Sequence, residues 1–570
     1  MSENPSTRWG ELIVGALAAG GVKTVVVAPG SRSTPLVVAA SKHEAIETFS
    51  IIDERSAAFF ALGRSKHTGT PTAVVCTSGT AGANMHPAVI EADRSRTPLL
   101  ICTADRPAEL HAAGANQTIS QDHLYGDAVR YAPTMPSASS HTNAMRAVRS
   151  TVGTAVRRST DPLPGPVHLN IPFRKPLSPA EPIEWAGSET EAPPTVTTEG
   201  GQLSPSDRAL DRIQTHLADA ARPLLIVGPG CQHARDALLS LAATLDVPTL
   251  ADPLSGLRFG DKRGARVISG YDGFLDPERI SEWPRPDLIL RFGARPTSVR
   301  LQEYLTSATG AHIAIDPGGE YRDPSFSTSD VITADPAAVA SALQDSISPQ
   351  SGSSWKQRFE RVERAYWEFV RQADVPPEAH IIHHTFAAAP DPATVFVSNS
   401  MPIRDADRFA ERNQQSLTVL GNRGASGIDG ITSTALGASS ATDDPAVLLT
   451  GDLALYHDMN GLLAITRCDV DATIVVLNND GGGIFQKLPI STIDPPFTEH
   501  FRTPHGLDVE QIATLYELPY QDLPAHMFAN EIADIMAKGG TTIVEVTIDG
   551  AKNHRQRDAF EARVRDAINY

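Results

Sequence analysis

The chain has 570 residues, of which 41% are hydrophobic and 20% charged, and its formal net charge is −18. It is too long for one hydrophobic core, and its composition is that of an ordinary globular protein with about three or four domains. The negative charge argues against a nucleic-acid partner or a membrane partner, and because the chain shows neither a long apolar run nor a signal-peptide pattern we expect it to be cytoplasmic.

Two segments rich in Pro, Ser, Thr and Gly are predicted linkers, at residues 176–206 and 346–354. They divide the chain into three parts, and we predict domains over residues 1–180, 205–345 and 355–570. Each part alternates helical patterns with short apolar runs, which in chain order are KTVVVAPG, TAVVCTSG, PLLICTAD, PVHLNIP, PLLIVGPG, DLILRFG, HIAIDPG, TVFVSNS, AVLLTGD, TIVVLNND and TTIVEVTI. This predicts an α/β fold of three consecutive domains, each with a mainly parallel sheet covered by helices. Ligands of such folds bind at the carboxyl ends of the strands.

Polar residues follow two apolar segments of the first part. After VVVAPG, Ser31 and Arg32 open a helical pattern, which predicts an anion site. Glu54 lies in FSIIDERSAAFFALG, and its apolar neighbours lead us to expect a poorly solvated carboxyl group whose neutral form is favoured near pH 7. A helix N-terminal pair of Asp53 and Glu54 that complements the helix dipole explains the same residues at least as well.

The middle part invites a dinucleotide-binding interpretation that its residues do not support. In PLLIVGPGCQH, Gly228 and Gly230 begin the glycine fingerprint, but His233 stands where the third glycine belongs. We therefore expect a central domain without FAD or NAD. Further on, His383 and His384 lie in a helical pattern, which favours a helix face over a metal or proton-transfer pair.

Two strand ends of the third part combine oxygen ligands with glycine. Asp452 follows AVLLTG, and Asn479 follows TIVVLN at 479 − 452 = 27 residues further on, which is room for one helix and one strand. Adjacent parallel strands would therefore place both side chains at one sheet edge. With a backbone carbonyl near Gly481 they form part of an oxygen octahedron, which suits Mg²⁺, and Gly451 would let a phosphate approach the backbone. Plain turns between helices and strands are the alternative explanation of either motif alone.

These two motifs resemble the thiamine-diphosphate motif, although Leu453 occupies a position that is Gly in many relatives. The strings APGSRSTPL, DERSAAFFALG, TSGTAGAN, TADRPAEL, GANQTI, NSMPIRDAD, GNRGASGIDG and NNDGGGIF further resemble the 2-succinyl-5-enolpyruvyl-6-hydroxy-3-cyclohexene-1-carboxylate synthase family of menaquinone biosynthesis. They cover the first and third parts, whereas the middle part matches only in architecture.

The resemblance implies a reaction, two cofactors and an assembly. It implies decarboxylation of 2-oxoglutarate on thiamine diphosphate, and addition of the resulting succinyl-type carbanion to isochorismate. The cofactors are thiamine diphosphate and Mg²⁺ or Mn²⁺, with the pyrimidine bound by the first domain and the diphosphate and metal by the third. The expected assembly is a homodimer or a dimer of dimers in which each site is built from two chains.

The resemblance also implies the roles of individual residues. Glu54 is the catalytic residue that hydrogen-bonds the aminopyrimidine ring, and the metal is held by Asp452, Asn479 and Gly481. The cofactor-binding residues are Thr77, Gly79, Gly451, Asp452, Leu453, Asn479, Ile428, Ile484 and Phe485. The substrate residues are Ser31, Arg32, Arg106, Asn116, Gln117, Arg300, Ser400, Arg404 and Arg423. Of these, Arg32, Arg106 and Gln117 face isochorismate, and Ser400, Arg404 and Arg423 hold the carboxylate of 2-oxoglutarate. Val299 precedes Arg300 where the family can place Lys, so the role of that lysine is absent here.

The sequence is also compatible with two other functions. One is another thiamine-dependent 2-oxoacid decarboxylase or carboligase, such as acetohydroxyacid synthase. The other is a non-catalytic relative that serves as a binding scaffold, against which the presence of both Glu54 and the metal set argues.

Overall fold

The computed structural model describes residues 4–139, 141–179, 200–347 and 354–568. Much of both predicted linkers, residues 180–199 and 348–353, lies outside the described residues. By its internal contacts the chain forms two compact units. The first comprises residues 1–201, 422–443 and 457–471, and the second comprises residues 202–421, 444–456 and 472–570.

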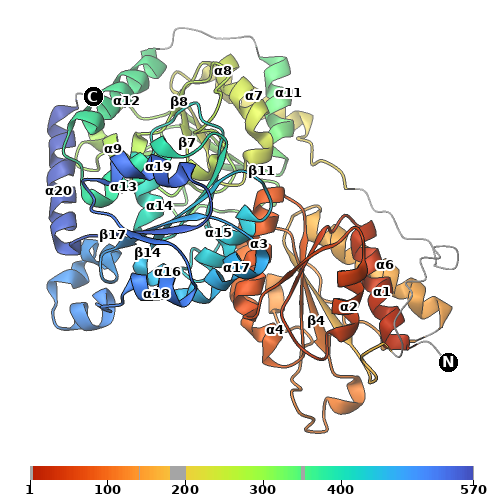
Figure 1. Cartoon of the computed structure of the whole chain (residues 1–570). Helices are drawn as coiled ribbons and strands as arrows, with labels where there is room; N and C mark the ends of the chain where they lie inside the picture. Colours follow the sequence, from red (N-terminus) through yellow and green to blue (C-terminus); the bar gives the residue numbers. More distant parts are fainter. Residues whose placement is uncertain (1–3, 140, 180–199, 348–353, 569–570) are drawn as a thin grey trace. The chain divides into compact units, whose positions relative to one another are not determined.

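The first unit is built on a five-stranded sheet in the order β2-β1-β3-β4-β5, with every neighbouring pair parallel. Its strands are β1 (Thr24–Val27), β2 (Glu47–Ser50), β3 (Thr72–Cys76), β4 (Leu99–Asp105) and β5 (Pro166–Pro172). Its helices are α1 (Pro5–Ala19), α2 (Thr34–Lys42), α3 (Glu54–Thr68), α4 (Thr80–Asn84), α5 (His86–Ser95), α6 (Thr142–Thr160), α15 (Ile431–Ser439) and α17 (Leu463–Cys468). Figure 1 shows α1, α2 and α6 on one side of this sheet and α3 and α4 on the other.

Helix α15 packs closely on α3 because glycines remove side chains from the contact. A Cβ atom on Gly63 would lie 1.9 Å from the carbonyl oxygen of Thr434, and one on Gly437 would lie 1.9 Å from that of Phe60. The two backbones therefore approach to a distance that only glycine allows. This contact fixes the segment that follows residue 422 to the first unit.

The second unit contains two six-stranded parallel sheets. The first has the order β11-β10-β9-β6-β7-β8 and comprises β6 (Pro223–Val227), β7 (Thr249–Ala251), β8 (Val267–Ile268), β9 (Leu288–Phe292), β10 (Ala311–Ile315) and β11 (Asp330–Ile332). The other has the order β13-β12-β14-β15-β17-β16 and comprises β12 (Ala393–Val397), β13 (Leu417–Leu420), β14 (Ala446–Gly451), β15 (Thr473–Asn478), β16 (Tyr520–Asp522) and β17 (Thr542–Thr547).

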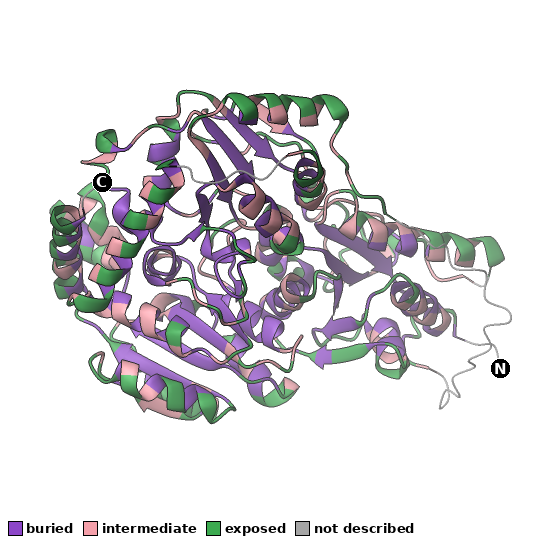
Figure 2. Ribbon diagram, turned by 90° about the horizontal axis from the view of Figure 1, so that it is seen from above, coloured by how far each residue is buried: buried purple, intermediate pink, exposed green. Residues whose placement is uncertain are grey.

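Helices accompany both sheets of the second unit. They are α7 (Asp207–Asp219), α8 (Arg235–Leu245), α9 (Tyr271–Phe274), α10 (Val299–Thr306), α11 (Pro336–Ser346), α12 (Ser354–Gln372), α13 (Pro377–Ala388), α14 (Met401–Phe409), α16 (Asp452–His457), α18 (Val509–Leu515), α19 (Phe528–Ala537) and α20 (Gly550–Ala567). Figure 2 shows that the strands are largely buried while the helices expose their outer faces. The predicted fold class of three parallel α/β sheets is therefore confirmed.

The sheet that contains β6 shares a hydrophobic core with helices of the C-terminal part of the chain. One continuous cluster of buried side chains joins Leu224 and Ile226 of β6 to Phe359 of α12 and Phe560 of α20. The indole N–H of Trp355 in α12 donates to the carbonyl of Pro223, 2.8 Å away. Helix α12 was predicted to open the third domain, yet it packs on the middle sheet. The domain boundaries at 1–180, 205–345 and 355–570 stay a prediction.

No helix among the described residues combines the length and the apolar composition that a membrane crossing requires.

Candidate active site

The strand register of the second unit brings Asp452 next to the loop that follows Asn479. Strands β14 and β15 are parallel neighbours, and Gly451 pairs with Leu477. Asp452 begins α16, and its Oδ2 accepts a hydrogen bond of 2.9 Å from the backbone N–H of Gly481. Its Oδ1 accepts one of 2.7 Å from the N–H of Leu453. The two predicted strand ends thus meet at one sheet edge.

The amide group of Asn479 is held at one end only. Its Nδ2 donates to Oε1 of Glu378 over 2.9 Å, while its Oδ1 is buried and has no hydrogen-bond partner among the described residues. A buried polar atom without a partner calls for an explanation, and one explanation is an ion or water that binds there. Amide and carboxylate oxygens are the ligands that Mg²⁺ prefers, so Asn479 and Asp452 fit such an ion.

The backbone between these residues is shaped by glycine. Gly481 has a φ of +129°, and a Cβ atom there would lie 2.0 Å from the carbonyl oxygen of Arg502. The same carbonyl accepts a 2.7 Å hydrogen bond from the N–H of Gly482, and Arg502 donates from Nη2 to the carbonyl of Asn479 over 2.8 Å. The described residues contain no cluster of three or more His, Cys, Asp and Glu side chains that could hold a metal. A metal here would therefore bind one carboxylate, one amide oxygen and backbone or non-protein oxygens.

His505 is a neighbour of Asp452 that sequence reasoning missed. Its Nε2 lies 3.2 Å from Oδ2 of Asp452, and its backbone N–H donates to Oδ1 of Asp480 over 3.0 Å. It comes from an irregular segment that carries no recognisable motif. Only the folded loop brings it to the strand ends.

The remaining predicted residues of the second unit surround this edge in part. Ile484 and Phe485 lie half-buried in a 3-10 turn, Gly483–Lys487, where Phe485 packs edge-on against Phe501 with ring centroids 5.8 Å apart. Ser400 precedes α14 with a φ of +72°, and Nη1 of Arg404 donates to its carbonyl over 2.5 Å. Burial lowers the pKa of the Arg404 guanidinium.

The guanidinium of Arg300 forms ion pairs with carboxylates of the protein itself. Its guanidinium pairs with the carboxylate of Glu561 and lies 4.0 Å from Oδ2 of Asp276. A contact with substrate would require Arg300 to leave these carboxylates. The role of Arg300 stays a prediction.

In the first unit, Glu54 is the first residue of α3 and is only partly buried. Its Oε2 accepts a long hydrogen bond of 3.4 Å from Nδ2 of Asn84, and Ile52, which was expected to shield it, is 55% exposed. In the single chain Glu54 is thus partly open to solvent, and its poor solvation in the complete site stays a prediction. Asp53 caps the helix by accepting from the N–H groups of Arg55 and Ser56 over 2.8 and 3.3 Å.

Three loops of the first unit meet beside the ends of β1 and β3. The N–H of Arg32 donates to Oγ1 of Thr77 over 3.2 Å, and that of Gly79 donates to Oε1 of Gln121 over 3.0 Å. Nε2 of Gln117 donates to the carbonyl of Ser78 over 2.9 Å. The structure thus joins three predicted loops, which carry Ser31, Arg32, Thr77, Gly79, Asn116 and Gln117.

The two predicted arginines of these strand ends retain unused donors. Arg32 is 4% exposed, and its Nη1 donates to the carbonyl of Phe173 over 2.7 Å. Arg106 follows β4, and its N–H donates to Oδ1 of Asp105 over 2.6 Å. In both arginines Nε is buried without a hydrogen-bond partner among the described residues. Each guanidinium therefore has one buried N–H group whose hydrogen bond is not satisfied within the described part of the chain.

The loop that carries Arg423 and Ile428 is held by a carboxylate that sequence reasoning missed. Glu91 of α5 is 3% exposed and accepts hydrogen bonds from the N–H groups of Gly424 and Ala425, over 2.9 and 2.7 Å. Nζ of Lys66 lies 3.0 Å from the same carboxylate. Glu91 lies inside a helical pattern, where nothing local distinguishes it from a surface residue.

Three family profiles match the chain. They are "Thiamine pyrophosphate enzyme, N-terminal TPP binding domain" over residues 7–124, "Middle domain of thiamine pyrophosphate" over residues 201–397, and "Thiamine pyrophosphate enzyme, C-terminal TPP binding domain" over residues 405–546.

Similar curated proteins carry the name 2-succinyl-5-enolpyruvyl-6-hydroxy-3-cyclohexene-1-carboxylate synthase. The protein of Haloarcula marismortui is 49% identical, and the match covers 99% of each chain. Those of Halobacterium salinarum and Roseiflexus sp. are 48% and 41% identical, each over 98% of both chains. Similarity of this extent shows that the chain belongs to the 2-succinyl-5-enolpyruvyl-6-hydroxy-3-cyclohexene-1-carboxylate synthase family of thiamine-diphosphate-dependent enzymes.

Proposed function

We propose that the protein converts 2-oxoglutarate and isochorismate into 2-succinyl-5-enolpyruvyl-6-hydroxy-3-cyclohexene-1-carboxylate and CO₂ in menaquinone biosynthesis. The observation that carries the proposal is the pair of Asp452 and the unpartnered amide oxygen of Asn479 at adjacent strand ends. This pair occurs in a chain whose full-length relatives bear the name of that product. The same relatives favour this reaction over that of acetohydroxyacid synthase and over a non-catalytic scaffold.

The residues of the second unit would bind the diphosphate end of the cofactor. Asp452, the Asn479 amide oxygen and the Gly481 carbonyl would hold Mg²⁺, or Mn²⁺ in its place, which would neutralise the diphosphate beside Gly451. The further cofactor contacts proposed are Thr77, Gly79, Leu453, Ile428, Ile484 and Phe485. When bound, thiamine diphosphate would supply a nucleophilic carbon that adds to the keto group of the substrate, and a cationic ring that takes up the electron pair released by decarboxylation.

Glu54 would act on the other end of the cofactor. Its carboxyl group would hold a proton at a ring nitrogen of the aminopyrimidine and return it during turnover. The partly exposed position of Glu54 at the start of α3 leaves its carboxylate accessible for this contact.

Two groups of residues would neutralise the substrate carboxylates. Arginine suits this task because its planar guanidinium matches a carboxylate through two hydrogen bonds. For isochorismate we propose Ser31, Arg32, Arg106, Asn116, Gln117 and Arg300. For 2-oxoglutarate we propose Ser400, Arg404 and Arg423.

The reaction is tested directly. Incubation with thiamine diphosphate, Mg²⁺, 2-oxoglutarate and isochorismate should yield a product with the mass of the named acid, and omission of isochorismate should remove it. A protein that instead joins two molecules of pyruvate, and leaves isochorismate unchanged, would have the activity of acetohydroxyacid synthase.

The metal assignment predicts that Asp452→Ala and Asn479→Ala each abolish Mg²⁺-dependent binding of thiamine diphosphate, because each removes an oxygen ligand. Calorimetry measures the affinity, and circular dichroism checks that the fold is retained. Unchanged affinity in both variants would refute the assignment.

For Glu54 we expect that Glu54→Gln still binds the cofactor but exchanges its thiazolium C2 proton at least about a hundredfold more slowly, since an amide cannot relay a proton. Proton exchange followed by NMR measures this rate. Exchange at the wild-type rate would remove Glu54 from the mechanism.

We also propose a homodimer, or a dimer of dimers, in which Glu54 of one chain and Asp452 of its partner serve one cofactor. Mixing Glu54→Gln and Asp452→Ala proteins under conditions of subunit exchange makes about half the dimers mixed, each with one intact site of two. Activity should then return to roughly a quarter of the wild-type value. If exchange is shown independently and activity stays at the level of the separate variants, each chain builds its own site.

A further inference from the structure

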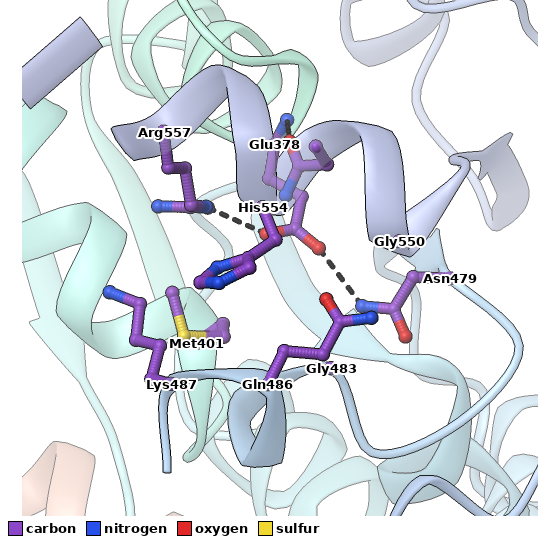
Figure 3. A pocket seen from close by; sticks show the side chains of 10 residues that line it. Glu378, Met401, Asn479, Gly483, Gln486, Lys487, Gly550, His554 and Arg557 are labelled. Atoms are coloured by element: carbon purple, nitrogen blue, oxygen red, sulfur yellow. Dashed lines mark hydrogen bonds and ion pairs between the residues drawn. The ribbon is translucent and has the colours of Figure 1, made fainter. Parts of the chain in front are cut away.

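A buried carboxylate lies directly behind the amide of Asn479. Glu378 of α13 is 3% exposed, and it lines a small pocket with Asn479 and Arg557 (Figure 3). Its Oε1 accepts from Nδ2 of Asn479 over 2.9 Å, and its Oε2 accepts from Nη2 of Arg557 over 2.6 Å. Each oxygen of Glu378 therefore has its own donor.

Arg557, the other partner of Glu378, is itself held in place by a second carboxylate. Arg557 of α20 donates from Nη1 and Nη2 to the two carboxylate oxygens of Asp405, over 2.6 and 2.5 Å. The guanidinium of Arg557 forms an ion pair with the Glu378 carboxylate, and both oxygens of that carboxylate act as acceptors of N–H donors.

An acceptor in this place decides which way the amide of Asn479 points. An amide offers a donor at one end and an acceptor at the other, so only Nδ2 can face Glu378. Figure 3 shows the amide nitrogen directed at Glu378 and the amide oxygen turned away from it. That oxygen is the buried atom without a partner.

We propose that Glu378 is a positioning residue of the metal site, which holds the Asn479 amide so that its oxygen, and not its nitrogen, faces the metal ion. This inference rests on the proposed function, because it takes Asn479 to be a metal ligand. It assigns no contact with metal or substrate to Glu378 itself, which acts through Asn479.

The preceding residue provides a comparison within the same loop. Asn478 is also held by a buried glutamate, since its Nδ2 donates to Oε1 of Glu545 over 2.6 Å. Its Oδ1, however, already accepts a 3.0 Å hydrogen bond from the N–H of Asp480. Both asparagines therefore donate to a buried glutamate, but the amide oxygen of Asn478 is used in the local turn, whereas that of Asn479 has no partner among the described residues. Glu545 therefore provides a matched control for Glu378.

The test is Glu378→Gln, which keeps the shape and removes the charge. The side-chain oxygen of the new amide would face the Arg557 guanidinium, so its NH₂ group would face Asn479 and turn the Asn479 amide over. An NH₂ group would then point at the metal. We expect Mn²⁺ binding, measured by electron paramagnetic resonance with saturating thiamine diphosphate, to weaken at least about tenfold.

A second substitution should restore the pattern of donors and acceptors. In the double variant Glu378→Gln with Asn479→Asp, one carboxylate oxygen accepts from the new amide and the other faces the metal. Mn²⁺ affinity should return to within about threefold of wild type, whereas Asn479→Asp alone sets two carboxylates against each other and should bind more weakly than the double variant. The control Glu545→Gln should change the affinity by less than about twofold.

Three results would overturn the inference. They are wild-type affinity in Glu378→Gln, a double variant no better than Glu378→Gln, and Asn479→Asp alone binding as well as the double variant. If Glu378→Gln does not fold by circular dichroism, the comparison of Asn479→Asp with the double variant decides. Unchanged Mn²⁺ affinity in Asn479→Ala would refute the metal assignment itself, whereas a loss there without a loss in Glu378→Gln refutes only the role of Glu378.

Discussion

The parallel register of β14 against β15 is the constraint on which the proposed metal site depends. Their paired residues run from Val447 with Thr473 to Gly451 with Leu477, so both strands end at the same edge. Both lie in the interior of a six-stranded sheet and are almost entirely buried, so a slip by one residue would break the hydrogen bonds to the strands on either side and require the packed side chains to rearrange. Because of this register, Asp452 and Asn479 follow neighbouring strands at the same edge of the sheet.

Buried ion pairs fix the second unit around this edge. Arg258 and Asp407 are almost fully buried and 2.8 Å apart, and Arg258 also donates to the carbonyls of Ala251 and Ala406. Arg408 pairs with Asp272 and with Glu561. Such pairs lose much of their attraction to desolvation, so they are weak evidence for stability. Their clearer effect is geometric, because they join the middle sheet's segments to α14 and α20.

The sequence predicted the strands that are largely buried, including the outer strand β5, and it missed five short outer strands. All the predicted apolar runs are strands, whereas β2, β8, β11, β13 and β16 were not predicted. Each of these is the outermost strand of its sheet and is short, and β2 alternates exposed and buried residues only weakly. An outer strand needs less apolar surface, so its sequence carries less of the signal. The unpredicted β7 has only three residues, Thr249–Ala251.

The residues of the candidate site likewise fall into those that a local motif predicted and those that no local motif could predict. Motifs next to strand ends placed Asp452, Asn479 and Gly481 correctly relative to one another, because strand adjacency determines their position. Glu378 lies 101 residues before Asn479 on a helix, and Glu91 lies 333 residues before Gly424, so no local pattern links them. The exposure of Ile52 beside Glu54 was likewise not predicted, because an apolar residue next to a carboxylate in the sequence can still face outward in the folded chain.

The proposed use of the Asn479 amide as a metal ligand would explain why the carboxylate of Glu378 is buried behind it. A carboxylate at residue 479 would present an oxygen in either orientation, but it would add a second negative charge beside Asp452. The amide of Asn479 keeps the charge lower and presents an oxygen in only one of its two orientations. Reversing it would set two acceptor oxygens, its own and that of Glu378, against each other and leave both unsatisfied. An unsatisfied buried group costs about 1–3 kcal/mol, which is roughly a five- to 150-fold preference for the observed orientation. A glutamine at residue 378 would turn its oxygen to Arg557 and its NH₂ group to Asn479, which would reverse the preference, whereas the carboxylate of Glu378 offers an acceptor oxygen to both neighbours.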